Sequence, residues 1–285
     1  MIDFDALWDY AKPEETEQKF RALLPQARES GDAGYLAELL TQIARTEGLQ
    51  HKFNDAHKTL DEAETLLRPG VSRPRVRSLL ERGRAFNSSG HPDKARPLFL
   101  EALEIAEIAG EDNLAVDAAH MMGIIEPPDK ALDWNLRAIG MAETSKDRKA
   151  RQWLGSLYNN IGWNYYETKK YDMALHLFEL ALEFREKQKQ APQIRIAKWC
   201  VAKTLRVLGR IDEALEIHKA LLIELEKIGE PDGFVFEEMG ECLLALGKPE
   251  DAKPHFTRAF DLLSKDSRLP HNEPERLVRL KSLGK

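Results

Sequence analysis

The fold is decided by residues 151–181, which read RQWLGSLYNNIGWNYYETKKYDMALHLFELA. Large apolar side chains in the first half recur at steps of three and four residues, at Leu154, Leu157, Tyr158, Ile161 and Tyr165. Side chains at these steps share one face of an α-helix. A polar turn then leads to a second stretch, in which Ala174 is followed by a large residue and another small one. We therefore predict two consecutive helices, paired as a hairpin.

The second half of this stretch recurs along the chain. A turn with an acidic or proline-containing start is followed by alanine in six copies, at Ala56, Ala95, Ala131, Ala174, Ala214 and Ala252. Each alanine has a small residue twelve positions earlier, and these are Ala44, Gly83, Ala119, Gly162, Ala202 and Gly240. Two small residues at this separation allow the helices of one hairpin to approach closely. The sequence thus predicts an array of repeats with a period near 40 residues.

The pattern resembles that of the tetratricopeptide family. Each repeat of that family has, in this order, a small residue, an apolar residue, a turn, an alanine, a large residue and a second alanine. The fourth copy fits best, with Tyr158, Ile161, Gly162, Tyr165, Ala174, Phe178 and Ala181. The long period is similar to that of kinesin light chains and of bacterial peptide-sensing proteins. Asn135 and His218 depart from the pattern in the third and fifth copies. The resemblance implies an all-α fold, a right-handed superhelical solenoid of about six hairpins.

The array is expected to have a cap at each end, because terminal repeats must hide an apolar edge. Residues 1–33 are predicted to form an N-terminal capping hairpin, and residues 34–266 the six repeats. Residues 267–285 should form a C-terminal cap, in which Pro274 to Leu283 has the pattern of a short amphipathic helix.

Composition narrows the classes of function. The net charge of −6 gives no general case for binding nucleic acid or an anionic membrane. No catalytic, nucleotide-binding or metal-binding motif is present in the sequence, so we expect a non-enzyme without metal or cofactor. The carboxylates Glu237, Glu238 and Glu241 are interpreted as a solvated helix face. The acidic N-terminus and the lack of long apolar stretches predict a cytoplasmic protein.

The resemblance also implies a binding groove lined by the first helix of each hairpin. Transferring the groove positions copy by copy gives Arg45, Arg84, Asn87, His120, Asn159, Trp163, Tyr166, Trp199, Lys203 and Arg206. These side chains are basic, amide or aromatic in an acidic chain. Cations hold carboxylates by charge-assisted hydrogen bonds, and amides can pair with an extended backbone. We therefore expect a scaffold that binds a protein or peptide partner through an acidic or C-terminal segment.

Other interpretations stay open from sequence alone. Arg45, Arg84 and Lys203 could be paired with glutamates of the neighbouring hairpin, Trp163 and Trp199 could be core residues, and His120 could be structural. At the level of function, the alternatives are a regulatory peptide-sensing module that acts on a separate partner, and a protein that assembles with its own copies.

Overall fold

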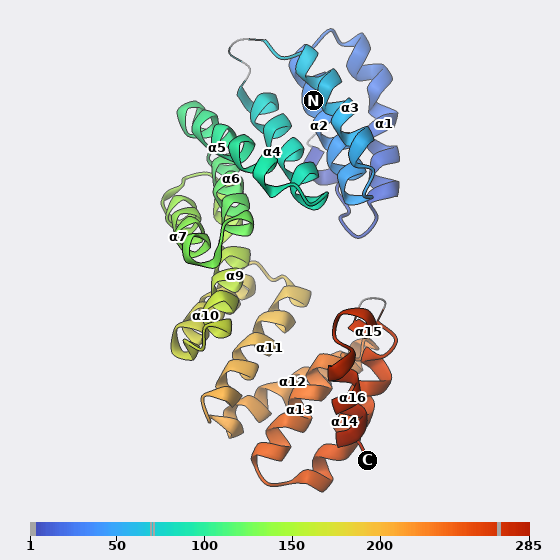
Figure 1. Ribbon diagram of the computed structural model, residues 1–285, viewed down its shortest axis with the longest axis vertical. Coiled ribbons are helices and arrows are strands. Elements are labelled where there is room, and N and C mark those ends of the chain that lie inside the picture. Colours follow the sequence, from blue (N-terminus) through green and yellow to red (C-terminus); the bar gives the residue numbers. More distant parts are fainter. Residues whose placement is uncertain (1–3, 69, 71, 267–268) are drawn as a thin grey trace. The chain divides into compact units, whose positions relative to one another are not determined.

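The computed structural model describes residues 4–68, 70, 72–266 and 269–285. The chain divides into two compact units, unit 1 (Met1–Leu157) and unit 2 (Tyr158–Lys285). Within the described ranges all regular structure is helical, as Figure 1 shows. The predicted start of the C-terminal cap at residue 267 lies outside the described residues.

Unit 1 begins with a short 3₁₀ helix and continues with α-helices. They are η1 (Phe4–Leu7), α1 (Pro13–Glu29), α2 (Ala33–Leu49), α3 (Phe53–Thr65), α4 (Ser72–Ser88), α5 (Pro92–Ala109), α6 (Asp112–Ile125), α7 (Pro128–Thr144) and α8 (Arg148–Gln152). Helix α9 (Leu154–Glu167) begins in unit 1 and continues into unit 2. The helices of unit 2 are α10 (Tyr171–Lys187), α11 (Ala191–Val207), α12 (Ile211–Ile228), α13 (Gly233–Ala245), α14 (Pro249–Leu263), α15 (Leu269–Asn272) and α16 (Pro274–Leu283).

The predicted all-α class and the hairpin repeats are confirmed. Five hairpins pair α2 with α3, α4 with α5, α6 with α7, α11 with α12 and α13 with α14. The sixth pairs α9 with α10, where the ring of Phe178 packs directly on Gly162. Acidic residues in the first turn of several second helices complement the positive end of the helix, as Asp93 and Asp212 do.

The small residues act as the sequence predicted, by bringing the two helices of a hairpin together. A Cβ atom on Gly83 would lie 2.4 Å from the ring of Phe99, and one on Gly162 would lie 2.5 Å from Phe178. Gly240 shows the same relation to Phe256, at 2.7 Å. The three rings are fully buried. Glycine at the first helix is therefore what makes room for phenylalanine on the second.

The other three copies carry alanine at this position, and each has a smaller side chain sixteen residues later. Leu60 follows Ala44 at that separation and packs in one cluster with it. Asn135 and His218 hold the equivalent positions after Ala119 and Ala202, and both are buried. The two departures from the family pattern thus coincide with loss of the glycine that a phenylalanine ring requires.

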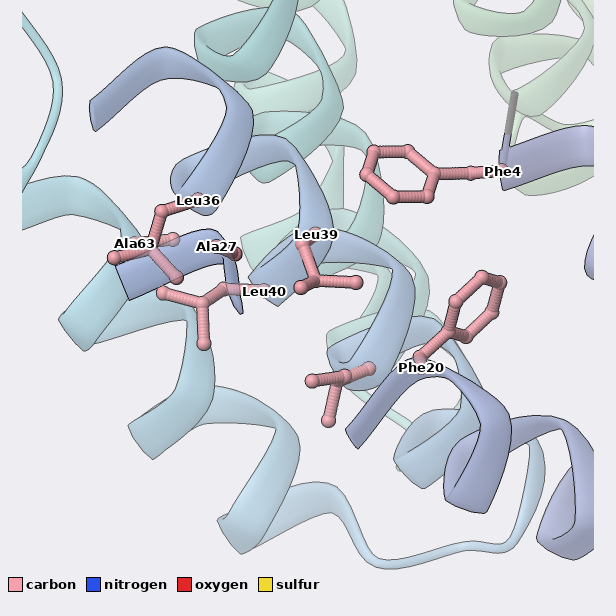
Figure 2. Close-up of a cluster of buried hydrophobic side chains, with 8 residues drawn as sticks. Phe4, Phe20, Ala27, Leu36, Leu39, Leu40 and Ala63 are labelled. Atoms are coloured by element: carbon pink, nitrogen blue, oxygen red, sulfur yellow. The ribbon is translucent and has the colours of Figure 1, made fainter. Parts of the chain in front are cut away.

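The two ends of the chain carry additional helices. At the N-terminal end, Phe4 of η1 and Phe20 of α1 pack against Leu39 of α2, as Figure 2 shows. At the C-terminal end, α16 covers the predicted residues and packs on α14. Its Leu280 is fully buried.

Candidate functional site

The first helices of the hairpins bring most of the predicted groove residues into two groups, one in each unit. We use the name inner face of unit 1 for Gln42, Arg45, Glu81, Arg84, Asp117 and His120, on α2, α4 and α6. The inner face of unit 2 comprises Asn159, Trp163, Tyr166, Trp199, Lys203, Arg206 and Glu238, on α9, α11 and α13.

Ion pairs between successive helices dominate the inner face of unit 1. The Arg84 guanidinium donates to Glu81 on its own helix, at 2.5 Å, and also binds Asp117 on α6. Arg45 on α2 lies 3.6 Å from the second oxygen of Glu81. The side chain of Arg84 is only 11% exposed. Two cations therefore meet two carboxylates, and this part of the face has no net charge.

His120 and Asn87 complete the predicted set in unit 1. His120 packs on Trp153, with 5.4 Å between ring centroids, and burial lowers its pKa. The imidazole is therefore neutral at pH 7. Asn87 is half-buried on α4, one turn beyond Arg84.

A different balance holds on the inner face of unit 2. Lys203 and Arg206 on α11 both bind Glu238 on α13, and the Arg206 Nε lies 2.7 Å from its carboxylate. Burial alone would raise the pKa of Glu238, but the two cations hold it below its ordinary value. Glu238 is 1% exposed, whereas the two cationic side chains retain contact with solvent. Here two cations share one carboxylate.

Aromatic rings flank these cations. Trp163 lies 5.9 Å from Trp199 and 5.2 Å from Tyr166, between ring centroids, and all three are half-buried. The Trp199 indole donates to the carbonyl of Phe234 at 3.2 Å, which fixes its orientation. The Lys203 ammonium lies 5.1 Å above the Trp199 ring, a cation–π distance. Burial raises the pKa of Tyr166 to about 12, so its phenol remains a hydrogen-bond donor.

Asn159 joins this group through a buried cysteine. The Cys200 thiol donates to the amide oxygen of Asn159 at 3.6 Å. Burial raises the pKa of Cys200 to about 12, and the same holds for Cys242. Both cysteines are therefore neutral thiols at pH 7 rather than reactive thiolates.

The interpretation of Glu237, Glu238 and Glu241 as a solvated face is wrong. Glu237 is 6% exposed and accepts from Arg276, at 2.5 Å, while Glu241 binds Arg279. Both arginines come from α16, which the packing of Leu280 places beside α13 and α14. Glu237 and Glu241 are thus neutralised by cations of the C-terminal helix, whereas Glu238 is neutralised by Lys203 and Arg206 of α11.

The alternative that Arg45 and Lys203 pair with glutamates of the neighbouring hairpin agrees with the structure, but the sequence analysis did not identify these carboxylate partners. Glu81, Asp117 and Glu238 stand two residues before the small residue of their copies. Their partners Arg45, Arg84 and Lys203 stand one residue after the small residue of the preceding copy. This spacing of about one repeat was the signal that could have revealed the pairs.

An apolar cavity in unit 2 was also not predicted. Its volume is about 750 Å³, and it lies where α11 and α12 meet α13 and α14. Ile196, Leu225, Phe234 and Leu262 contribute to the lining, and Trp199 links it to the inner face. Within the part of the chain that the structure describes, no cluster of three or more histidine, cysteine or acidic side chains is arranged to hold a metal ion. None of the described helices is both long and apolar enough to cross a bilayer.

The architecture and these faces define a helical-hairpin repeat protein. Models of the tetratricopeptide repeat match residues 76–121 and 154–187. Tetratricopeptide repeats are thus present at these residues, as the sequence predicted. No curated sequence matches it significantly.

Solved structures with similar folds come from several classes of protein. The chain superposes with a TM-score of 0.73 and 14% identity on a signal transduction ATPase with a tetratricopeptide repeat sensor from Pyrococcus horikoshii. That match covers 95% of this chain but only 42% of the ATPase chain. Aspartyl phosphate phosphatase F from Bacillus subtilis superposes with a TM-score of 0.59 and 16% sequence identity. That match covers 90% of this chain and 73% of the phosphatase. NprR in complex with its cognate peptide NprX superposes with a TM-score of 0.52 and 16% sequence identity. That match covers 98% of this chain and 82% of NprR.

Proposed function

We propose that this protein is a non-catalytic scaffold that binds a peptide segment on the inner face of unit 2. The observation that carries the proposal is the local charge balance, in which Lys203 and Arg206 share the single carboxylate of Glu238. One positive charge remains in excess beside three partly exposed aromatic rings. This combination suits an acidic side chain or a C-terminal carboxylate.

The half-buried cations make this face suitable for recognition. The Lys203 and Arg206 side chains are 17% and 20% exposed, and Glu238 holds them in place. A cation with a fixed position loses little rotamer freedom when a ligand binds, which favours affinity. Trp199 is fixed by its bond to the Phe234 carbonyl, so it offers an ordered apolar contact. The similarity in fold to NprR, which was solved with a bound peptide, is in keeping with this use of a repeat face.

A peptide library tests the proposal directly. The purified chain is used to select from a library in which acidic, basic and apolar residues alternate, with free and amidated C-termini. We expect enrichment of acidic peptides with an aromatic or aliphatic neighbour. Loss of binding on amidation would assign the contact to the terminal carboxylate, and retention would assign it to an acidic side chain.

Two variants of α11 test whether the selected peptide binds at the inner face of unit 2. Lys203→Gln should lower the affinity for the selected peptide about tenfold, because one charge-assisted hydrogen bond is lost. Lys198→Gln, on the same helix but outside the inner face, should leave the affinity unchanged. Circular dichroism and melting temperature confirm that both variants are folded. Equal affinity for the two variants, or selection of basic peptides, would refute the proposal.

A further inference from the structure

One stripe of side chains on α11 runs from the apolar cavity of unit 2 onto the inner face. Pro192, Ile196 and Trp199 line the cavity, and Lys203 and Arg206 follow them toward the end of the helix. Successive members are three or four residues apart, so they share one side of the helix. The stripe is therefore apolar in its first half and cationic in its second, and Trp199 lies where the two halves meet.

The cavity has an apolar floor and a wall with a fixed position. Leu225 and Val235 of the floor are 6% and 2% exposed and belong to one buried cluster. In the wall, the carbonyl of Phe234 accepts from the Trp199 indole at 3.2 Å, and its backbone N–H donates to the Asp232 carboxylate at 2.8 Å. The volume of about 750 Å³ lies within the range of roughly 300–1,000 Å³ that is typical of ligand pockets. The cavity is therefore formed before any ligand arrives.

The charges at its mouth favour an uncharged occupant. Arg195, the cation that α11 contributes to the lining, lies 3.3 Å from Glu224 and 3.3 Å from Glu230. Because two carboxylates already pair with this guanidinium, an acidic ligand group gains little from it. Ile196 at the same mouth is 57% exposed and offers an apolar contact. An acidic group is thus favoured at the cationic half of the stripe, and an apolar group at the cavity.

The two halves are close enough for one short peptide to reach both. The Lys203 ammonium lies 5.1 Å above the ring of Trp199, which itself lines the cavity. Ile196 precedes Lys203 by seven residues, which corresponds to about 10.5 Å along the helix axis. A peptide in the polyproline II conformation advances about 3.1 Å per residue and brings every third side chain to the same side. Three residues of such a peptide therefore span the two halves of the stripe.

We propose that the cavity receives an apolar side chain of the same peptide whose acidic group binds Lys203 and Arg206, and that these two peptide residues are about three positions apart. The inference rests on the proposed function, because it assigns a second contact to the same ligand. A leucine or phenylalanine side chain suits the uncharged mouth and the apolar floor. Trp199 contacts both parts of the ligand.

A series of synthetic peptides tests the spacing. Each peptide consists of serine and glycine with blocked ends, and carries one glutamate and one leucine at a separation of one to seven positions, in either order. A peptide with the glutamate alone is the reference, and NMR titration measures every affinity, including the weak ones. We expect the highest affinity at a separation of about three positions. It should exceed that of the reference at least about tenfold, because a leucine side chain is buried.

Two exposed isoleucines of unit 2 provide a matched pair of variants. Ile196→Gln at the mouth should lower the affinity for the best peptide about fivefold and leave that of the glutamate-only reference unchanged. Ile223 on α12 is 55% exposed and lies outside the cavity, so Ile223→Gln should change neither affinity. Lys203→Gln should lower both. Circular dichroism confirms that the variants keep their helices.

A photoreactive diazirine analogue of leucine in the best peptide locates the apolar side chain. We expect cross-links to Ile196, Leu225 or Leu262. Cross-links to Trp163 or Tyr166 instead, highest affinity when glutamate and leucine are adjacent, or equal effects of the two isoleucine variants would overturn the inference and leave the proposed function standing. If Lys203→Gln does not change the affinity of the glutamate-only peptide, the proposed function itself fails, and this inference fails with it.

Discussion

The inner faces of the two units are built from the same repeat positions but differ in charge and in coverage. In unit 1, Arg45 and Arg84 meet Glu81 and Asp117, so cations and carboxylates are equal in number. In unit 2, Lys203 and Arg206 share Glu238. Residues 4–10 also lie against unit 1, where the Trp8 indole donates to the amide oxygen of Gln42 at 2.8 Å. In both units the next copy supplies a carboxylate to the cation that follows the small residue. The difference comes from Arg206, a second cation on α11 that shares the carboxylate of Glu238.

The largest effect should come from removing the shared carboxylate. Glu238→Gln leaves two half-buried cations without a charged partner, and should cost unit 2 about 3 kcal/mol. Asp117→Asn in unit 1 should cost about 1–2 kcal/mol, because Arg84 keeps its bond to Glu81. Hydrogen exchange of α13 and α6 measures the two losses separately. Equal losses would contradict the difference between the faces.

His218 should make unit 2 sensitive to acid. It is fully buried without a hydrogen bond to either ring nitrogen, and burial lowers its pKa to about 4. The unfolded chain takes up this proton near pH 6.5, so stability falls as the pH drops from about 6.5 toward 4.

His218→Leu copies the pairing of Ala44 with Leu60 and removes this loss. We expect a gain of about 1 kcal/mol at pH 7, because an unpaired buried polar group disappears. The gain should grow to about 3 kcal/mol at pH 5. Urea unfolding followed by fluorescence of Trp163 and Trp199 checks both values. A gain that is independent of pH would show that His218 does not titrate on unfolding.

The glycines test whether the units differ in their cores as well as on their faces. Gly83→Ala in unit 1 and Gly240→Ala in unit 2 should each cost about 2 kcal/mol, since the new Cβ overlaps a buried phenylalanine ring. Gly140→Ala, which meets no atom within 4 Å, should instead stabilise by about 0.5–1 kcal/mol. Melting temperatures of the three variants measure this. If the two substitutions lower the free energy of unfolding by similar amounts, the cores of the two units are alike. The units then differ only in their inner faces.

The smallest effect should come from the exposed pair at the C-terminal helix. Arg279 is 52% exposed where it binds Glu241. Arg279→Gln should cost less than about 1 kcal/mol, because solvent screens the pair. Arg276→Gln should cost more, since Glu237 is buried and accepts most of its bonds from this guanidinium. Hydrogen exchange of α16 compares them, and the reverse order would contradict the assignment of burial.

The sequence predicts the repeats well because their spacing reflects local geometry. A glycine in the first helix of a hairpin predicts a phenylalanine that packs on it sixteen residues later, as it does at Gly83, Gly162 and Gly240. The site is less predictable, because a cation such as Arg84 has the same helical position whether it is free or paired. Its state depends on Asp117, a full repeat away. The contact of Asp5 with Lys149 has no signal in the repeat spacing, since it depends on how a segment outside the array folds back.

Hydrogen exchange of the intact chain with its best library peptide tests the central claim most directly. We predict that the peptide slows exchange in α9, α11 and α13, while α2 and α4 keep the rates of the free chain. Slower exchange in α2 and α4 alone, or no change in either unit, would contradict the assignment of the inner face of unit 2 as the peptide-binding surface.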